Sequence, residues 1–478
     1  MAKQSSLKER HERVYRALME ANQEHLLRWF DELDHTRQAH LLDELESLSW
    51  QTLATLVKTH VLGRPHVEIP VSLEPADVYP HQPTDDLRDR YEEARRLGRE
   101  LIAAGKVAAF TVAGGQGTRL GFDGPKGQVE VTPVGNKSLF WIFAETIKAV
   151  RERYGVPIPW YIMTSPANHR QTLDYLQAND FFGLPEAEVS LFSQAMLPAF
   201  DGQGRALLAE KYRLALAPDG HGGSLKALVA SGALRDMQKR GIEIISYFQV
   251  DNPLVKPFDP LFVGLHVTTG SEMSSKVSPK VDDLEKVGNM CKGDGKVMVI
   301  EYSDLPDELA HARNADGTRK FNAGSLAIHM LDVSFIQRIV GDTFELPYRR
   351  AEKKVPFVDD HGLSVEPESS NAVKLEMFVF DALPLAENPL VLEVDRAEEF
   401  SPVKNATGVD SLESSMRDQN SRACRWLEAA GVNVPRKPDG EPDVIVTIAP
   451  SFATDAEDVK PKSSLVPALK SGDRIVLE

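Results

Sequence analysis

A glycine-rich loop directly after a short apolar run constrains the fold of this chain more than any other feature. Val107–Val112 reads Val-Ala-Ala-Phe-Thr-Val, the composition of a strand buried in a parallel sheet. Glycines follow at positions 114, 115, 117 and 121. Glycine lets the backbone come close to a ligand and expose its N–H groups to phosphate oxygens. The pattern therefore predicts an α/β fold with a ligand-binding loop at the end of a strand.

Two cations make this loop a candidate polyphosphate cradle. Arg119 offers a fork that can bind phosphate in a bidentate manner, and Lys126 offers a mobile point charge. Without these cations, a tight turn with no ligand would be the better interpretation. A dinucleotide fingerprint does not fit, because the third glycine comes one residue too late. A Walker A loop does not fit either, since Lys126 is followed by Gly127 rather than by Ser or Thr.

Length and composition narrow the class of protein. A chain of 478 residues exceeds what one core usually covers, so we expect two or three domains. The formal net charge of −16 argues against nucleic acid or an anionic membrane as a partner. The two cysteines, without metal or paired spacing, suit a reducing compartment. With no signal core and no run near the roughly 20 apolar residues of a membrane span, we expect a cytoplasmic protein.

The order of elements predicts three parts. Residues 1–104 are predicted to form helices followed by a Pro-rich connector, which includes Pro65, and a further helix at about 85–104. Residues 105–400 alternate between strands and helices, as in a Rossmann-like α/β domain with helices flanking the sheet. Residues 401–478 are predicted to form a small β-rich lobe. We expect strands near 107–112, 159–164, 242–250, 296–302, 324–330 and 391–394, and helices at 138–153 and 223–240.

Polar residues at strand ends and in a second glycine loop are candidates for chemistry. Asp251 follows an apolar strand, where a carboxylate can hold Mg²⁺ or simply cap a turn. Gly220 and His221 lie in a glycine loop that precedes a helix, and this loop could meet a nucleotide or only solvent. Gln194 carries both a donor and an acceptor, as recognition of a uracil edge requires, although a surface glutamine is the commoner interpretation.

Three further positions suit a sugar phosphate, each with a simpler alternative. Glu301 at a strand end could accept hydrogen bonds from sugar hydroxyls, and Asn322 beside a glycine could contact an amide or a hydroxyl. Lys404 follows an extended Pro turn. A solvated glutamate, a turn and a solvated lysine are the alternatives. We interpret the pairs Arg349-Arg350 and Lys353-Lys354 as a solvated helix face.

Taken together, the motifs resemble the eukaryotic-type UDP-N-acetylhexosamine pyrophosphorylases, within the wider UDP-glucose pyrophosphorylase family. The matching blocks, in order, are G-G-Q-G-T-R-L-G with P-K-G, F-S-Q-A-M-L-P-A, A-P-D-G-H-G-G, V-D-N, E-Y-S, F-N-A-G, K-L-E-M-F-V-F-D and E-F-S-P-V-K-N-A. They cover residues from about 105 to 410. The chain departs from the family at His221, where Asn is common, and at Ser325, where the block F-N-A-G-N ends in Asn.

The resemblance implies a GT-A-like nucleotidyltransferase body and a role for each matching residue. It implies nucleotide binding by Gly114, Gly115, Gly117, Thr118, Gln194, Gly220 and His221. It implies catalytic contacts to phosphate by Arg119, Lys126 and Lys404, and Mg²⁺ binding by Asp251. It implies sugar contacts by Gly288, Glu301, Asn322, Phe378 and Phe380.

The implied reaction is attack of a sugar 1-phosphate on the α-phosphorus of UTP, which releases pyrophosphate and forms a UDP-sugar. A monomer or a weak homo-oligomer is expected. The first alternative is a UDP-glucose or broad-specificity UDP-sugar pyrophosphorylase. The second is a nucleotide-sugar sensor without catalysis, which the combination of Arg119, Lys126, Asp251 and Lys404 disfavours. An NAD-dependent enzyme fails on the spacing of the loop.

Overall fold

The computed structural model describes residues 6–63, 69–341 and 346–478. Pro65 and the first five residues lie outside the described residues. The contacts group the chain into two compact units. The smaller unit takes three separate segments (Met1–Glu68, Gln194–Ser224, Glu345–Asp381), and the larger unit takes the rest (Ile69–Ser193, Leu225–Phe344, Ala382–Glu478). The predicted parts 1–104, 105–400 and 401–478 are each one continuous segment of the chain, whereas each unit combines several segments that contact one another.

The larger unit is built on a mixed sheet that belongs to an α/β fold. Its strands are β1 (Leu73–Pro75), β2 (Val107–Val112), β3 (Trp160–Thr164), β4 (Val189–Ser193), β10 (Ile244–Gln249), β11 (Met273–Pro279), β12 (Asn289–Gly293), β13 (Lys296–Ile300), β14 (Ala323–Asp332) and β19 (Leu390–Glu393). The strand order through the centre is β12-β14-β10-β2-β3-β4. β10, β2, β3 and β4 run parallel, and β14 is antiparallel to β10. The predicted sheet flanked by helices is confirmed, and its pairing is mixed.

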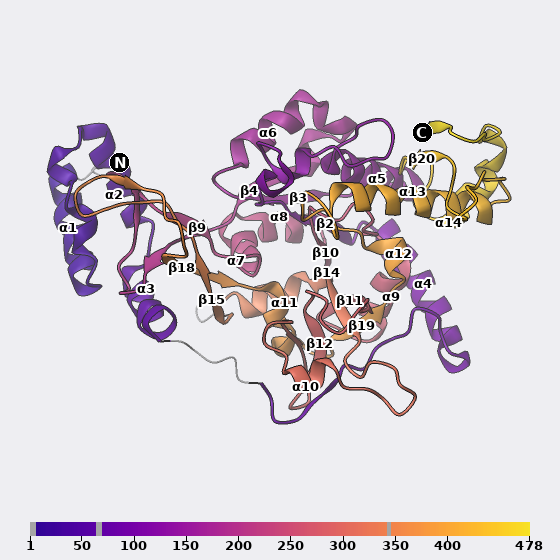
Figure 1. Ribbon diagram of the computed structural model, residues 1–478, viewed down its shortest axis with the longest axis horizontal. Helices are drawn as coiled ribbons and strands as arrows, with labels where there is room; N and C mark the ends of the chain where they lie inside the picture. The colour runs from indigo at the N-terminus through magenta and orange to yellow at the C-terminus, as the bar shows by residue number, and fades with distance from the viewer. Residues whose placement is uncertain (1–5, 64–68, 342–345) are drawn as a thin grey trace. The chain divides into compact units, whose positions relative to one another are not determined.

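Helices cover the sheet of the larger unit. They are α4 (Arg88–Ala103), α5 (Leu139–Tyr154), α6 (His169–Ala178), α8 (Ala233–Lys239), α9 (Pro260–Thr268), α10 (Asp307–Ala310), α11 (Val333–Ile339) and α12 (Arg396–Glu399). Apolar residues of α4, α5 and α9 share one core with β2, β3, β10 and β14. α8 and α11 lie on the opposite side of the sheet from α4 and α9 (Figure 1).

The crossing of α4 and α9 depends on two glycines. A Cβ atom at Gly98 would lie 1.9 Å from the Pro260 carbonyl oxygen, and one at Gly264 would lie 1.7 Å from the Ala94 carbonyl oxygen. The two backbones therefore approach more closely than any other residue type would permit.

Most predicted elements of this unit are confirmed within two residues, but two predictions are wrong. The single helix expected at 223–240 is two helices, α7 (Gly223–Ala230) and α8, because Gly232 between them adopts a φ of +82°. The lobe predicted to be β-rich contains more helix than strand. It contains α13 (Leu412–Ala429), α14 (Ala456–Val459) and a two-stranded sheet of β20 (Ile445–Ile448) and β21 (Arg474–Leu477).

The smaller unit combines an N-terminal helical layer with short strands. Its helices are α1 (Leu7–Glu20), α2 (His35–Glu46) and α3 (Trp50–Leu56), which confirms the helical prediction. Its strands are β5 (Met196–Pro198), β6 (Phe200–Asp201), β7 (Leu208–Glu210), β8 (Arg213–Leu214), β9 (Leu216–Pro218), β15 (Tyr348–Lys353), β16 (Phe357–Val358), β17 (Ser364–Val365) and β18 (Ala372–Met377). Leucines of α2 share a core with Phe200, Leu214 and Leu375.

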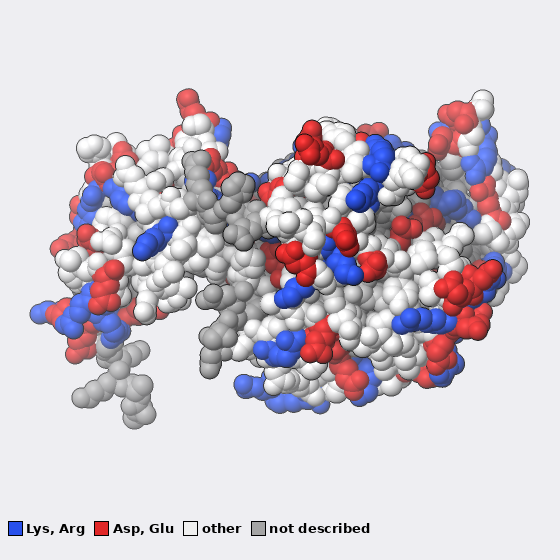
Figure 2. All heavy atoms as spheres, turned by 90° about the horizontal axis from the view of Figure 1, so that it is seen from below, with Lys and Arg blue, Asp and Glu red and all other residues white. Residues whose placement is uncertain are grey.

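Charged side chains are dispersed over the surface. On the face shown in Figure 2, basic and acidic side chains are interspersed, so the acidic excess forms no single continuous patch there. None of the helices in the described ranges is both long enough and apolar enough to span a bilayer.

Candidate functional site

The glycine loop after β2 is closed by its own backbone. The Gly117 N–H donates to the Gly124 carbonyl at 2.8 Å, and the Lys126 N–H donates to the Gly115 carbonyl at 3.1 Å. Gly115, Thr118 and Arg119 are exposed within this closed loop, while Gly114 is partly buried. Backbone N–H groups that are not used in the closure can therefore meet a ligand, as the sequence predicts.

Two glycines of the loop region are required by geometry. Gly121 ends the short helical turn Thr118–Leu120 with a φ of +73°, which disfavours residues with a Cβ atom. A Cβ atom at Gly127 would lie 2.2 Å from the ring of Phe140, so the chain after Lys126 packs directly on α5. Lys126 is therefore held on a backbone that the helix supports.

Asn168 positions the loop and was not singled out from the sequence. Its amide nitrogen donates to the carbonyl oxygens of Ala113 and Gly115 at 3.0 and 3.2 Å, and its amide oxygen accepts from the Ser165 N–H. Asn168 is fully buried and precedes α6. A polar residue just after β3, the parallel neighbour of β2, was the available signal.

Asp251 lies at the same edge of the sheet as the glycine loop. β10 runs parallel to β2 up to the pair Gln249 and Val112, and the Val250 N–H then donates to the Val112 carbonyl. The Asp251 carboxylate lies 3.3 Å from the Lys126 ammonium, and both side chains are mostly buried. The structure thus brings together two of the predicted phosphate and metal residues, 125 positions apart in sequence.

Lys404 is tied to the turn that carries Asp251. The preceding residue, Val403, donates its N–H to the Asp251 carbonyl at 2.8 Å. The Lys404 ammonium lies 3.8 Å from Asp410 and 5.5 Å from the ring centre of Phe400. This tether places the third predicted cation in the chain segment next to Asp251.

Asn252 supports the same connection and was not singled out from the sequence. Its amide nitrogen donates to the Glu399 carbonyl at 2.7 Å, and its amide oxygen accepts from the N–H groups of Leu254 and Ser401. The side chain is buried. It therefore joins the Asp251 turn to the segment that leads to Lys404.

The predicted sugar residues of the larger unit, Gly288, Glu301 and Asn322, each lie directly beside the end of a strand, near the start of β14. β14 runs antiparallel to β10, so its first residues lie beyond the carboxyl end of β10, on the side of Asp251. Gly288 precedes β12, and its carbonyl accepts from the Ser325 N–H at 2.8 Å. A Cβ atom at Gly288 would lie 3.2 Å from the Glu301 carboxylate. Gly288, Glu301 and Ser325 are therefore neighbours.

Asn322 is occupied by the backbone of the larger unit. Its side-chain oxygen accepts from the Lys280 N–H at 3.2 Å, and its carbonyl accepts from the same N–H at 3.0 Å. This contact fastens the start of β14 to the end of β11. Its side-chain nitrogen is the part of the amide that can still act as the predicted sugar contact.

Three of the predicted nucleoside and sugar residues, His221, Phe378 and Phe380, form an aromatic cluster in the smaller unit. The His221 imidazole is stacked on Phe378 with ring centres 5.0 Å apart and an interplanar angle of 6°, and it lies 5.7 Å from Phe380. Its Nδ1 accepts from the Val379 N–H at 3.2 Å. These residues come from two segments that are more than 150 positions apart in sequence.

The second glycine loop is packed against β18 in this cluster. Gly220 has a φ of +85°, and a Cβ atom there would lie 2.4 Å from the Met377 carbonyl oxygen. The Gly222 N–H donates to that same carbonyl, and the Met377 N–H donates to the Asp219 carbonyl. Gln194 is also buried, and it lies two residues before β5, in the chain segment that leads to this loop.

Arg349 belongs to this cluster, and the prediction of a solvated helix face at 349–354 is wrong. The segment forms strand β15, which pairs with β18. The Arg349 guanidinium binds the Asp381 carboxylate at 2.8 Å and lies 5.1 Å from the ring centre of Phe378. The segment Tyr348–Lys353 has no alternation of apolar and polar residues, so no local signal indicated a strand.

Burial changes the protonation of His221. Burial, which removes water from the imidazolium, together with a smaller effect of the positive charge of Arg349, lowers the pKa of His221 from 6.5 to about 4. The imidazole is therefore neutral near neutral pH and has Nδ1 as an acceptor.

The Asp251 carboxylate fits a magnesium ion for which the substrate phosphates supply most of the remaining ligands. In the described ranges, no cluster of three or more His, Cys, Asp or Glu side chains could hold a metal. Asp251 supplies one carboxylate at the edge of the sheet, and Mg²⁺ is commonly bound by one or two carboxylates with water and substrate phosphates completing its octahedron.

Comparison with known sequences matches residues 71–438 to the family described as UTP–glucose-1-phosphate uridylyltransferase. A UDP-N-acetylhexosamine pyrophosphorylase-like protein 1 from Xenopus tropicalis is 38% identical over 433 residues, which cover 87% of this chain and 84% of that protein. The UDP-N-acetylglucosamine pyrophosphorylase of Saccharomyces cerevisiae is 36% identical over 434 residues, which cover 87% and 91% of the two chains.

Comparison with solved structures gives the same relatives. The crystal structure of a putative UDP-N-acetylglucosamine pyrophosphorylase from Entamoeba histolytica matches with a TM-score of 0.74 and 32% identity, covering 85% of this chain and 99% of that one.

Proposed function

This chain belongs to the UTP–glucose-1-phosphate uridylyltransferase family and is a UTP:sugar-1-phosphate uridylyltransferase, and we propose that its sugar substrate is an N-acetylhexosamine 1-phosphate. The products are then a UDP-N-acetylhexosamine and pyrophosphate. The main structural support for a catalytic site is the Lys126–Asp251 ion pair at 3.3 Å. It lies beside a glycine loop that is closed by its own backbone hydrogen bonds. The similarity to the relatives named above supports the choice of an N-acetylated sugar.

The reaction needs positioning and charge neutralisation more than covalent help. An oxygen of the sugar 1-phosphate attacks the α-phosphorus of UTP in line, a P–O bond forms, and the bond to the leaving pyrophosphate breaks. Both reactants are anionic, so we assign Arg119, Lys126 and Lys404 to offset their repulsion and the charge that develops during transfer. Asp251 and the tether at Val403 hold two of these cations in place.

The remaining residues recognise the two ends of the UDP-sugar. We assign Gly114, Gly115, Gly117 and Thr118 to the phosphates of the nucleotide, and Gln194, Gly220 and His221 to the nucleoside. We assign Gly288, Glu301 and Asn322 to the sugar, together with Phe378 and Phe380. The contact of Gly288 with Glu301 and Ser325 supports a sugar subsite at the start of β12 and β14.

We further propose that Asp251 binds Mg²⁺, which would neutralise charge on the phosphates when it is bound. We propose a GT-A-like arrangement for the sheet, because the glycine loop and Asp251 follow adjacent parallel strands. A cytoplasmic location is in keeping with the two free cysteines, and a monomer or weak homo-oligomer remains our expectation.

A panel of sugar 1-phosphates tests the proposed substrate. UTP and Mg²⁺ are combined with N-acetylglucosamine 1-phosphate, N-acetylgalactosamine 1-phosphate or glucose 1-phosphate, and pyrophosphate release is measured. We expect kcat/KM to be at least about tenfold higher for an N-acetylated substrate than for glucose 1-phosphate, a difference of about 1.4 kcal/mol in transition-state stabilisation.

Each other outcome identifies an alternative. Faster turnover of glucose 1-phosphate would establish a UDP-glucose pyrophosphorylase, and equal rates would establish a broad UDP-sugar pyrophosphorylase. Binding of a UDP-sugar without any exchange of pyrophosphate would establish a sensor.

A further inference from the structure

A cavity in the larger unit lies apart from the residues assigned above. Its volume is about 380 Å³, within the usual range for sites that bind small molecules. Its lining comes from α4, α5, the segment after Asp251, and the C-terminal helices and loops. None of the glycine loop, Lys126, Asp251 or Lys404 lines it.

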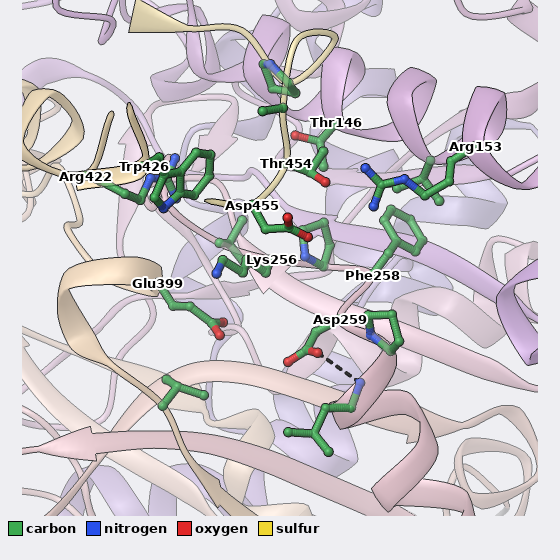
Figure 3. A pocket seen from close by; sticks show the side chains of 18 of the residues that line it. Thr146, Arg153, Lys256, Phe258, Asp259, Glu399, Arg422, Trp426, Thr454 and Asp455 are labelled. Atoms are coloured by element: carbon green, nitrogen blue, oxygen red, sulfur yellow. Dashed lines mark hydrogen bonds between the residues drawn. The ribbon is translucent and has the colours of Figure 1, made fainter. Parts of the chain in front are cut away.

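Charged side chains from distant segments converge on this cavity (Figure 3). Arg153 reaches it from α5, Arg422 from α13, and Lys256 from the segment that follows Asp251. Arg95 and Arg99 of α4 also line it. The aromatic side chains of Phe258, Tyr154 and Trp426 complete the lining.

The lining has four acidic side chains, and three of them contact other parts of the protein, whereas the fourth, Glu393, adds a negative charge to the wall. Asp259 and Glu399 both bind the buried ammonium of Lys276, at 2.8 and 2.6 Å. Asp455 caps α14 by accepting from the Asp458 N–H. Asp259 and Glu399 are therefore engaged mainly by Lys276, and the charge of Glu399 also acts on Arg422.

Several cations of the lining lack a carboxylate. Within the described part of the chain, Arg95, Arg99 and Arg422 have no carboxylate oxygen within 4.0 Å. Arg422 Nη1 donates only to the carbonyls of Leu254 and Glu398, and burial lowers the pKa of Arg422 from 12.5 to about 10. Burial disfavours the charged guanidinium of Arg422 more than the nearby Glu398 and Glu399 offset, and a bound anion would relieve that cost.

We propose that this cavity binds a small organic anion, a phosphate or carboxylate attached to a ring, and that the bound anion acts on the catalytic turn at Asp251. The anionic group meets Arg422 and the arginines of α4, and the ring lies among the aromatic side chains of the lining. This would be a binding site outside the transfer reaction itself.

The hydrogen bonds of Arg422 supply the connection to the catalytic turn. Through the Leu254 carbonyl, Arg422 holds the segment that begins at Asp251, and through the Glu398 carbonyl it holds the segment that ends at Lys404. Asn252 joins the same two segments. An anion that draws Arg422 into the cavity therefore acts on both segments. This effect on activity rests on the proposed function, whereas binding does not.

Calorimetry with a defined probe tests the binding. Phenyl phosphate, benzoate and the neutral benzyl alcohol are titrated into the full chain, with and without saturating UTP. We expect phenyl phosphate to bind at one site per chain, and we expect saturating UTP to change its Kd less than about twofold. The Kd of benzyl alcohol should be at least about tenfold higher than that of phenyl phosphate.

Variants locate the site. We expect Arg422→Gln to raise the Kd of phenyl phosphate at least about tenfold. Arg417→Gln on the same helix, whose side chain is exposed and does not line the cavity, leaves the Kd unchanged. Arg99→Gln changes an exposed residue of the lining, so it gives the same test without threatening the fold, with a rise of at least about threefold.

The outcomes separate this proposal from the proposed function. Absence of binding at millimolar probe, competition with UTP, or a Kd that is the same in the Arg422 and Arg99 variants would overturn the site. A probe that binds as expected but leaves kcat and KM unchanged would overturn the action on the catalytic turn. Binding in a chain that fails to release pyrophosphate would support the site and contradict the proposed function.

Discussion

The glycine loop of the larger unit and the aromatic cluster of the smaller unit are built in opposite ways. The loop is a single continuous segment, closed by backbone hydrogen bonds and partly exposed, and its chemistry comes from N–H groups and cations. The cluster brings together His221, Phe378 and Arg349 from distant segments, and its chemistry comes from ring stacking and burial.

This difference decides what each region tolerates. A backbone loop at the surface can accept a side-chain change without losing its shape, so such a change alters activity more than stability. A packed cluster of interlocked rings and backbone has no free space, so a change there alters stability first.

The largest expected effect comes from adding one methyl group at matched glycines in the two regions. Gly220 and Gly121 both have positive φ, but only Gly220 would place its Cβ against a carbonyl oxygen, at 2.4 Å. We expect Gly220→Ala to destabilise the smaller unit by about 3 kcal/mol and Gly121→Ala to destabilise the larger by about 1 kcal/mol. Thermal unfolding followed by calorimetry measures both.

Equal losses of stability in the two alanine variants would show that positive φ alone accounts for the cost. The clash at the Met377 carbonyl would then be absorbed by movement of β18, and the cluster would be less tightly packed than its geometry indicates.

The same contrast explains how much of the molecule could be predicted from the sequence. The strand Val107–Val112 and its loop were predicted correctly because a buried run followed by glycines is a local signal. Asp251 could be placed beside the loop because parallel strands end at a common edge.

The aromatic cluster depended on pairing that no local signal contains. Arg349 was assigned to a solvated helix because its neighbours are charged, but pairing of β15 with β18 brings it to Asp381 and Phe378. Likewise, α13 was not foreseen because its apolar residues are sparse, and its stability comes from the core that it forms with β20 and β21. Tertiary context decided both.

A smaller effect is expected when a cation of the loop is removed. We expect Arg119→Ala and Lys126→Ala each to lower kcat at least about tenfold, or about 1.4 kcal/mol of transition-state stabilisation. The exposed Arg119 can be replaced with little change in unfolding temperature, whereas Lys126→Ala leaves the mostly buried Asp251 carboxylate without its partner and also lowers that temperature. Pyrophosphate release under saturating substrates measures the rate. Lys239→Ala on α8, an exposed lysine outside the site, is the matched control.

Wild-type turnover in both loop variants would contradict the assignment of the loop to phosphate. A loss of activity in Arg119→Ala that is accompanied by a large drop in unfolding temperature would instead show that the loop is a structural support, and the contrast between the two regions would disappear.

The smallest expected effect is a pH dependence of stability that belongs to the aromatic cluster. Because the pKa of His221 is about 4 in the folded chain and 6.5 when the side chain is exposed, the unfolded chain binds more protons between these values. Stability from this group is therefore complete above about pH 6.5 and falls as the pH decreases toward 4, with a loss of about 1 kcal/mol between about pH 7 and 5.5. His221→Asn removes this contribution while it keeps a side-chain acceptor, so the free energies of unfolding of the two proteins, measured in urea, should converge as the pH falls.

His25, whose pKa burial also lowers, is present in both proteins and cancels in the comparison. An identical pH dependence in the wild type and His221→Asn would show that the imidazole is hydrated in solution, and the rings of Phe378 and Phe380 would then not enclose it as they do here.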